Sequence, residues 1–531
     1  MLETSATSDQ ENHSVTTDVL IVGAGPTGLS LALQLMRYGI SFVICDKKEG
    51  VTHLSKALVV HARTLEIYDQ IGLADHAVAG GQVAEQLTLL HDGKVRVRLD
   101  LAGFGNGLTP FPFLLFFEQS KNETLLFDAL QQDGREVLWQ TEMESLSQGA
   151  GGVRAVLKSA DGRERVVEAR YVVGCDGASS TTRHQLGMGF EGSTLPRLFY
   201  VADVDMNIEL EKSSMYMVPG DDSFALLFPM QGENHWRLIG NLPEYEHEGK
   251  IDQNVPYAEV ERKVKSLVQI PLDIAQVRWF STYKVHTRHA RTFSLGRCFV
   301  AGDAAHIHTP AGGQGMNTGI QDAYNLAWKL ALVLKGKAGE FLLETYNEER
   351  LANAKRLLRS TDLMFDTMSG DSWYQRFFRD DVLPNVLPWL TRFPAVRESL
   401  FPFVSQIAIT YRDHSLSQHE GDGHFKVKAG DRMPHFEVGG TGIYDQLRAP
   451  CFHLLLFSDD AKKSEALKTG LQKHGSMVDF AVVPPTNQVK EIFGIGSSFL
   501  VLLRPDNYIA LLSADLSLGD MESYFAQLSV A

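Results

Sequence analysis

The sequence predicts an α/β protein that combines a nucleotide-binding sheet, an antiparallel sheet and a further small α/β domain. Three observations predict this class. An apolar strand near the N-terminus runs directly into a glycine-rich turn and a helix, and a second strand–glycine loop–helix unit lies near residue 300. Between them, residues 190–285 hold short apolar strands in succession. Strands alternating with helices favour parallel sheets, whereas successive strands favour antiparallel pairing.

The first unit places glycines between a strand and a helix. Residues 19–22 (VLIV) form the strand, residues 23–28 (GAGPTG) the turn and residues 29–37 the helix, and a second strand at 42–45 ends in Asp46. Such glycines let the backbone approach a pyrophosphate at a helix N-terminus, and the acidic residue roughly 20 positions on reaches a ribose hydroxyl. The unit therefore predicts adenine-dinucleotide binding rather than an ordinary strand–turn–helix connection. The expected contacts are Gly23, Gly25, Pro26, Gly28, Asp46 and Lys47.

The second unit repeats this arrangement with a longer loop. Residues 298–301 (CFVA) form an apolar strand that runs into Gly302 and Asp303, and the loop 309–317 (TPAGGQGMN) follows. Residues 317–334 carry apolar side chains at the spacing of a helix packed on one face. Loop glycines bring backbone N–H groups close to an electron-rich ligand, and the helix dipole favours negative charge there. A connection that only packs is the weaker interpretation.

A third segment indicates which dinucleotide is bound. A strand at residues 169–175 ends in Asp176 and Gly177, and Ser180 and Arg183 follow. The three segments together resemble the class A flavoprotein monooxygenases, the single-component aromatic hydroxylases typified by para-hydroxybenzoate hydroxylase and phenol hydroxylase. The resemblance covers nearly the whole chain and is greatest to the phenol-hydroxylase and polyketide-hydroxylase branch. It implies an FAD-binding Rossmann-like fold of the para-hydroxybenzoate hydroxylase type, an antiparallel-sheet substrate domain and a C-terminal thioredoxin-like domain.

The resemblance also implies where the domains lie. The FAD-binding domain is expected to be discontinuous, over residues 15–190 and 285–345, with the substrate-binding sheet at 190–285 between its two parts. A helical segment at 345–410, interrupted by prolines, precedes a polar linker. Alternating strands and helices over residues 428–531 have the size of a thioredoxin domain, for which we expect a structural or dimerisation role.

Composition narrows the class of function. The chain has 531 residues, 44% of them hydrophobic, and a formal net charge of −15, which argues against nucleic acid and anionic membranes as partners. No apolar run approaches the ~20 residues of a membrane span. Residues 1–17 are polar and read as a disordered tail rather than a signal peptide. The four cysteines are widely spaced, and Cys451 stands alone in its domain, so we expect reduced thiols, no metal site and a cytoplasmic protein.

The resemblance assigns FAD contacts to particular residues. Asp303 would bond the ribityl chain, and residues 312–317 would lie along the pyrimidine edge, where N–H groups stabilise the negative charge of reduced flavin. Pro310 would stand beside the reactive C4a–N5 edge of the flavin. The remaining expected contacts are Lys56, Arg63, Gln119, Asp176, Gly302, Gly313, Gly315, Met316 and Asn317.

For three of these residues the sequence is compatible with more than one role. Lys56 stands where many relatives carry Arg, and a lysine lacks the bidentate fork that holds a pyrophosphate. Arg63 faces either a phosphate or solvent. Gln119, four residues before Glu123, matches the family helix whose Gln touches the flavin, or else it begins a solvated helix.

The reaction implied by the resemblance has two halves. NADPH or NADH reduces FAD. The sequence has no second G-x-G-x-x-G turn between a strand and a helix, so the nicotinamide cofactor is expected to dock transiently without a nucleotide-binding domain of its own. O2 then forms a flavin C4a-hydroperoxide, whose distal oxygen hydroxylates a phenolic or polycyclic aromatic substrate; the enzyme is also expected to form a homodimer. Epoxidation or Baeyer–Villiger insertion is the alternative chemistry, and a flavoprotein without oxygenase activity is the non-enzymatic alternative.

A phenol is activated by loss of its proton, so a base or a proton relay is expected. Tyr283, His286 and Arg288 lie on the strand that enters the second unit, and alternation places Tyr283 on the face opposite the other two. We expect Pro310, Tyr283 and His286 to be catalytic, although ordinary core or surface roles remain open for the last two. His306 and His308 are expected to support the loop rather than to bind a metal.

Overall fold

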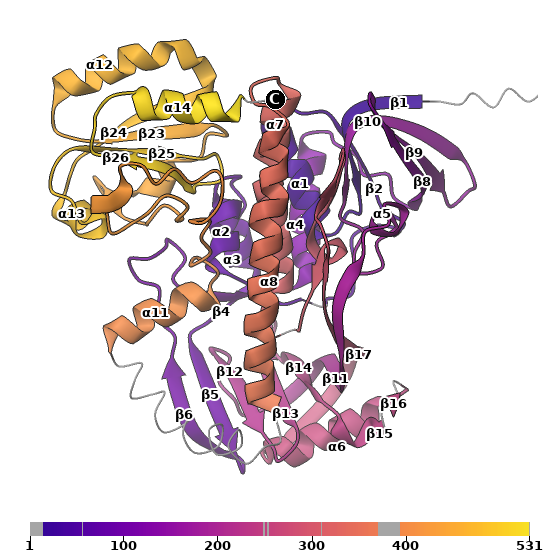
Figure 1. The fold of residues 1–531 in the computed structure, drawn as a ribbon. Coiled ribbons are helices and arrows are strands. Elements are labelled where there is room, and N and C mark those ends of the chain that lie inside the picture. The colour runs from indigo at the N-terminus through magenta and orange to yellow at the C-terminus, as the bar shows by residue number, and fades with distance from the viewer. Residues whose placement is uncertain are drawn as a thin grey trace, which may run out of the picture.

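The computed structural model describes residues 14–529 apart from 56, 248–249, 252–253, 310 and 370–392. Lys56 and Pro310 therefore lie outside the described residues. Figure 1 shows three parts of a mixed α/β molecule: a helix-covered sheet, an antiparallel sheet at the bottom, and a C-terminal α/β domain at upper left. The long helix α8 (Phe341–Ser369) runs down the middle of the view.

The helix-covered sheet draws its strands from two distant parts of the sequence. Its order is β18-β19-β10-β1-β2, with β9 paired to β10 and β8 paired to β9. The four central strands are parallel, so their carboxyl ends meet at one edge of the sheet. The strands are β1 (Ser14–Val22), β2 (Phe42–Cys45), β8 (Thr141–Gly149), β9 (Gly152–Ser159), β10 (Glu164–Gly174), β18 (Ser294–Leu295) and β19 (Cys298–Val300).

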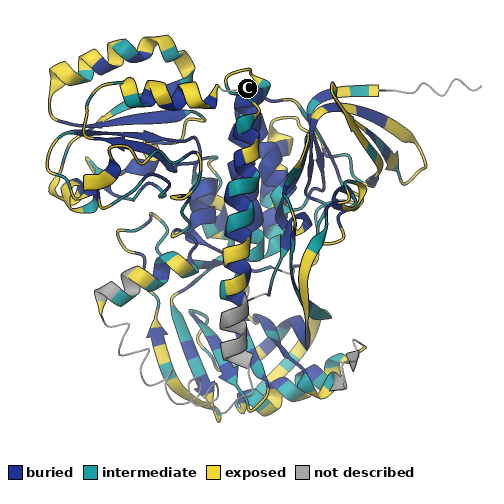
Figure 2. Ribbon diagram, in the orientation of Figure 1, coloured by how far each residue is buried: buried dark blue, intermediate teal, exposed yellow. Residues whose placement is uncertain are grey.

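Helix α1 (Pro26–Arg37) packs closely against α7 (Gly315–Leu334), and α4 (Gln119–Gln132) lies beside α1. The expectation that α7 packs on one face is corrected by the structure, because every residue from Asn317 to Val333 is buried. Helix α8 and residues of the C-terminal domain contact α7 outside the apolar face that the sequence pattern predicts to be buried. Figure 2 shows the contrast between the buried interior and the exposed outer surfaces.

The antiparallel region is an eight-stranded sheet with the order β20-β17-β11-β14-β13-β12-β5-β6. Helix α6 (Tyr257–Val268) covers one face through the fully buried Val260, Val264 and Val268. The sheet extends beyond residues 190–285, because a hairpin with an Asp-Gly turn adds β5 and β6. Its strands are β5 (Gln86–His91), β6 (Lys94–Asp100), β11 (Phe190–Ile208), β12 (Ser214–Pro219), β13 (Phe224–Pro229), β14 (His235–Asn241), β17 (Leu272–Ala290) and β20 (His306–Ile307).

The C-terminal domain has a four-stranded sheet with the order β24-β23-β25-β26. Only the β23–β24 pair is parallel, and a helix follows β23, β24 and β26, an element order compatible with the expected thioredoxin-like domain. The short helix α13 (Asn487–Phe493) was not predicted from the sequence. The other elements are β23 (Phe452–Phe457), α12 (Ala461–Leu471), β24 (Val478–Val483), β25 (Phe499–Leu503), β26 (Ile509–Ser513) and α14 (Gly519–Leu528).

Smaller elements join these parts. A three-stranded sheet, β3-β7-β4, lies between the helix-covered sheet and the antiparallel sheet. Within the described part of the chain, no helix is long and apolar enough to cross a membrane. The remaining elements are β3 (Val59–Val60), α2 (Ala62–Asp69), α3 (Ala74–Gly80), β4 (Gln82–Ala84), β7 (Leu114–Phe116), α5 (Thr181–Gln185), β15 (Glu246–His247), β16 (Lys250–Ile251), α11 (Pro394–Val404), β21 (Glu437–Val438) and β22 (Thr441–Gly442).

Candidate functional site

The two glycine units of the sequence meet at the carboxyl edge of the helix-covered sheet. A Cβ at Gly28 would lie 1.9 Å from the Gly23 carbonyl oxygen, and one at Gly23 would lie 2.3 Å from the Cys175 carbonyl oxygen. A Cβ at Gly302 would lie 2.4 Å from Thr27 Oγ1. Gly23 and Gly28 are required by close backbone packing in the turn and beside the end of β10, and Gly302 by the Thr27 side chain of α1.

Gly25 differs, because a Cβ there would meet nothing within 4 Å. Gly25 is also the N-cap of α1, whose first turn begins with Pro26 and has no side-chain cap. Open space above uncapped N–H groups fits a phosphate group. The Asp46 carboxylate lies beside this turn, since it accepts hydrogen bonds from the backbone N–H groups of Ala24 at 2.7 Å and Lys48 at 2.9 Å.

A buried carboxylate anchors the segment that follows β2. Glu123 accepts hydrogen bonds from Lys48 Nζ at 3.1 Å and Gln119 Nε2 at 3.0 Å. Gln119 Oε1 accepts from the backbone N–H of Ala57 at 3.2 Å, so this side chain contacts the loop instead of extending into solvent. The expected contact Lys47 is exposed, whereas Lys48 is the lysine that points to this cluster. Sequence reasoning missed Lys48, for which no motif gave a signal.

The Gly-Asp turn is held from two sides. The Gly302 N–H donates to Asp322 Oδ2 at 3.0 Å, and Arg183 Nη1 donates to the Ala304 carbonyl at 2.9 Å. Asp303, between these anchors, is exposed at the turn. The turn therefore presents the Asp303 carboxylate on a fixed backbone.

Asp176 supports the same region through α5. Its carboxylate accepts hydrogen bonds from Ser180 Oγ at 2.5 Å and from the Thr182 backbone N–H at 2.9 Å. This arrangement caps the helix that carries Arg183. Asp176 thus orients Arg183 toward the Gly-Asp turn.

Asn317 fixes the glycine loop before α7. Its Oδ1 accepts from the His61 backbone N–H at 2.9 Å and from Thr64 Oγ1 at 2.7 Å, while its Nδ2 donates to the carbonyls of Val59 at 2.8 Å and Gly313 at 2.9 Å. With these four bonds the side chain holds the loop in place. Gly313 has φ +63°, and its neighbours Gly315 and Met316 begin α7 without a side-chain cap.

Two histidines beside this loop stay neutral near pH 7. Burial lowers the pKa of His61 to about 4, and its Nε2 is 3.0 Å from the Gly312 carbonyl. Burial also lowers the pKa of His308 to about 4, and its Nδ1 is 2.7 Å from the Thr309 carbonyl. His308 Nε2 is buried without a partner and lies 3.5 Å from where a Gly315 Cβ would be. An unpartnered acceptor at an uncapped helix start fits a flavin ring better than a structural connection.

Arg63 requires a correction, because it faces neither a phosphate nor solvent. It is buried, its Nη1 donates to Glu66 Oε2 at 2.9 Å, and its Nη2 donates to the Asp506 carbonyl at 2.8 Å. Asp506 belongs to the C-terminal domain, and no sequence pattern predicts a contact between that domain and α2. Arg63 therefore joins two domains.

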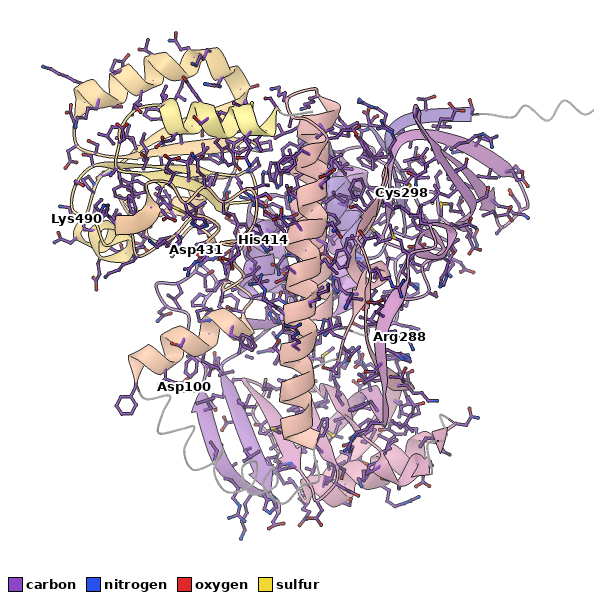
Figure 3. All side chains as sticks on the ribbon, in the orientation of Figure 1. Asp100, Arg288, Cys298, His414, Asp431 and Lys490 are labelled. Atoms are coloured by element: carbon purple, nitrogen blue, oxygen red, sulfur yellow. The ribbon has the colours of Figure 1, made fainter. Side chains whose placement is uncertain are left out.

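The long strand β17 separates the two expected substrate-activating residues. Tyr283 stacks on Phe199 with ring centroids 5.8 Å apart. His286 and Arg288 lie on the opposite face, where both contact Thr194 Oγ1, at 2.8 and 3.2 Å, and Figure 3 labels Arg288 on this strand. His286 is therefore not brought together with Tyr283. Burial raises the pKa of Tyr283 above its ordinary value, so Tyr283 stays a protonated hydrogen-bond donor.

The face that carries Tyr283 adjoins the glycine loop. The strand registers place Leu226, Ile239 and Met217 on this face. Leu226, Ile239 and Val59 pack against the same buried apolar cluster. Val59 Cβ lies 2.8 Å from where a Gly313 Cβ would be. The half-buried apolar side chains on this face are Met215, Met217, Phe224, Leu226 and Ile239.

One ion pair lies on the same face. Arg237 donates to both carboxylate oxygens of Asp203 at 2.7 Å, and its Nη1 is 3.3 Å from the Ala57 carbonyl. Both side chains are buried and their charges cancel. The bond from Arg237 to Ala57 connects the sheet to the loop that contacts Gln119. Across the described residues, no group of three or more His, Cys, Asp or Glu side chains is arranged to hold a metal ion.

Comparison with known proteins agrees with this geometry. A family model described as "FAD binding domain" matches residues 16–361. The 6-methylpretetramide 4-monooxygenase of Streptomyces rimosus is 34% identical over 514 residues, covering 93% of this chain and 90% of the relative. The pentachlorophenol 4-monooxygenase of Sphingobium chlorophenolicum is 29% identical over 528 residues, covering 95% of each chain.

A solved structure gives the same result for the fold. The anhydrotetracycline hydroxylase OxyS from Streptomyces rimosus superposes with a TM-score of 0.72 at 28% identity, covering 94% of this chain and 96% of the other. The expected fold class and FAD cofactor are therefore confirmed. The chain belongs to the FAD-dependent aromatic hydroxylases, the class A flavoprotein monooxygenases.

Proposed function

We propose that this enzyme hydroxylates a neutral, planar polycyclic phenol. One observation carries the proposal: the sheet face next to the glycine loop is apolar, and its ion pair nearest Tyr283 is already neutralised. An anionic substrate would need an unpaired cation at this face, because burying an unpaired carboxylate is costly. Apolar side chains such as Leu226, Ile239 and Met217 suit fused aromatic rings instead.

FAD and the residues of the chain have separate roles in the proposed reaction. FAD, reduced by NADPH or NADH, supplies the activation of O2 when it is bound. The uncapped start of α7 offers backbone N–H groups to negative charge at the flavin ring. Tyr283 donates a hydrogen bond to the substrate oxygen, and the apolar face excludes water from the reacting carbon.

Two relatives support the same substrate class. The relative from Streptomyces rimosus is a 6-methylpretetramide 4-monooxygenase, and the solved OxyS structure is an anhydrotetracycline hydroxylase.

We also propose that the enzyme is a cytoplasmic homodimer. The four free cysteines support a reducing compartment, and the family resemblance supports the dimer. Light scattering during size exclusion would measure the mass of the assembly.

Matched substrate pairs test the proposal. Each pair consists of a hydroxylated polycyclic compound and the same compound with one added ring carboxylate. We expect the neutral member to accelerate NAD(P)H oxidation and to give a product heavier by one oxygen atom, with kcat/KM at least roughly tenfold above the carboxylated member. A consistent preference for the carboxylated members, or for single-ring hydroxybenzoates, would contradict the proposal.

A further inference from the structure

A buried carboxylate contacts the turn formed by Gly302 and Asp303, and none of the sequence motifs includes it. Asp322 lies in α7, fully buried, two turns of helix beyond the glycine loop. Its Oδ2 accepts from the Gly302 N–H at 3.0 Å and lies 2.8 Å from His306 Nε2. Gly302 and His306 bracket Asp303, so a single oxygen atom fixes both ends of the turn that presents Asp303.

The charge of Asp322 is maintained by an arginine from α8. Arg350 Nε donates to Asp322 Oδ1 at 2.6 Å, and neither side chain is exposed. Burial raises the pKa of Asp322, but Arg350, His306 and the Gly302 N–H together outweigh burial, so the pKa lies below its ordinary value. Asp322 is therefore an ionised acceptor, and charge-assisted hydrogen bonds are the stronger kind.

Arg350 is in turn oriented from the connection to the C-terminal domain. Its Nη1 donates to the Tyr411 hydroxyl at 2.8 Å and its Nη2 to the Thr318 carbonyl at 3.3 Å. The Tyr411 ring lies 4.4 Å from the ring of Tyr508 in the C-terminal domain, measured between centroids. A continuous set of contacts thus runs from that domain to the Gly-Asp turn.

We propose that Asp322 is a positioning residue for FAD, which sets Gly302 and Asp303 for the cofactor, and that Tyr411 acts on FAD binding through Arg350 and Asp322. The C-terminal domain then contributes to the cofactor site without touching the cofactor. That the protein binds FAD follows from its family, and the role proposed for Asp322 does not depend on which substrate is hydroxylated. Its failure is therefore distinguishable from failure of the substrate proposal.

The test compares two buried ion pairs that cross between the same two helices. Lys329 of α7 and Glu349 of α8 pair at 2.8 Å and are as buried as Asp322 and Arg350, but they do not contact the Gly-Asp turn. Asp322→Asn removes the charge and leaves a side chain of equal size. Lys329→Met is the control, because Glu349 keeps its bond to Arg504 Nη1 at 2.5 Å.

The readouts are the FAD dissociation constant, the visible spectrum of bound FAD and the melting temperature of the apoprotein. We expect Asp322→Asn to weaken FAD binding roughly tenfold or more and to shift the flavin band, while Lys329→Met lowers the melting temperature without either change. Tyr411→Phe should weaken binding in the same direction but less. The double variant Asp322→Asn/Tyr411→Phe should bind FAD no more weakly than Asp322→Asn alone, because the two residues act in one chain.

A second matched pair keeps the proposal falsifiable if Asp322→Asn does not fold. Tyr444 also accepts from a partly buried arginine, Arg432, yet this arginine reaches Glu66 rather than the Gly-Asp turn. Tyr411→Phe should therefore weaken FAD binding where Tyr444→Phe does not. Equal FAD affinities for Asp322→Asn and Lys329→Met, additive effects in the double variant, or equal effects of the two tyrosine variants would each overturn the proposal.

Discussion

At the scale of single residues, two glycines of the same turn do different work. A Cβ at Gly25 meets no protein atom within 4 Å, whereas one at Gly28 meets a carbonyl oxygen at 1.9 Å. We therefore predict that Gly25→Ala leaves the apoprotein melting temperature unchanged but weakens FAD binding roughly tenfold, by crowding the phosphate. Gly28→Ala should instead destabilise the apoprotein itself. Titration of the apoproteins with FAD, beside thermal melts, checks both results; normal FAD affinity in Gly25→Ala would contradict the placement of the phosphate.

Tyr283 and Tyr200 offer a matched pair on opposite faces of one sheet. Tyr283 faces the glycine-loop side, while Tyr200 is fully buried on the α6 side with a hydroxyl that has no partner. We predict that Tyr283→Phe reduces kcat for substrate hydroxylation about tenfold with FAD affinity unchanged, because a donor to the substrate oxygen is lost. Tyr200→Phe should leave both quantities unchanged. Steady-state hydroxylation assays measure the difference, and equal kcat values for the two variants would remove Tyr283 from the site.

At the scale of elements, the loop between β25 and β26 joins the C-terminal domain to α7 and α8. Arg504 pairs with Asp506 at 2.6 Å and with Glu349 at 2.5 Å, with all three side chains buried. We predict that Arg504→Met destabilises the protein by about 3–5 kcal/mol, because two buried carboxylates lose a partner. The surface pair of Arg163 and Asp161 is the control, and Arg163→Met should have no measurable effect. Urea unfolding of both variants tests this, and an Arg504→Met protein as stable as wild type would contradict it.

Local patterns predicted the elements around the cofactor well. The glycine turn, the strand at residues 42–45 and the Gly-Asp loop follow from short-range rules of strand, turn and helix, and the structure places them at one sheet edge. Short-range patterns do not predict which sides of a helix other elements cover. The apolar spacing predicts that α7 packs on one face, yet α1, α8 and residues of the C-terminal domain together bury it on all sides.

The interactions that the sequence did not predict share one feature: their partners are distant in sequence. Asp322 and Arg350 are 28 residues apart, and Arg63 reaches Asp506 across 443 positions. A signal for Asp322 was nevertheless present, because a carboxylate within an otherwise apolar helix must find a partner when it is buried. For Arg63 the sequence offered no such indication, since its helix is not strongly apolar.

At the scale of the whole molecule, buried neutral histidines make stability depend on pH. The folded pKa of His61 is about 4, whereas an unfolded histidine has a pKa of about 6.5. Between these pH values the unfolded chain binds a proton that the folded chain does not, so the free energy of unfolding falls as the pH drops from about 6.5 to 4. The loss attributable to His61 is about 3 kcal/mol.

The histidine contribution is measured against a variant. His61→Gln cannot titrate, so its melting temperature should fall less than that of the wild type between pH 7.5 and 4.5. The carboxylates with lowered pKa values, such as Asp322, are common to both proteins and cancel in the comparison. An identical decline in the two proteins would show that His61 is not held neutral.

The central proposal is that this chain positions an aromatic ring on the Tyr283 face of the sheet, where bound FAD would supply one oxygen atom from O2. The most direct measurement supplies the FAD-loaded enzyme with NAD(P)H, 18O2 and a hydroxylated polycyclic substrate, and then determines the mass of the product. We expect a ring-intact product that carries one 18O atom for each NAD(P)H consumed in coupled turnover. Products whose added oxygen comes from water, or substrate-stimulated NAD(P)H oxidation that never labels any aromatic compound, would contradict it.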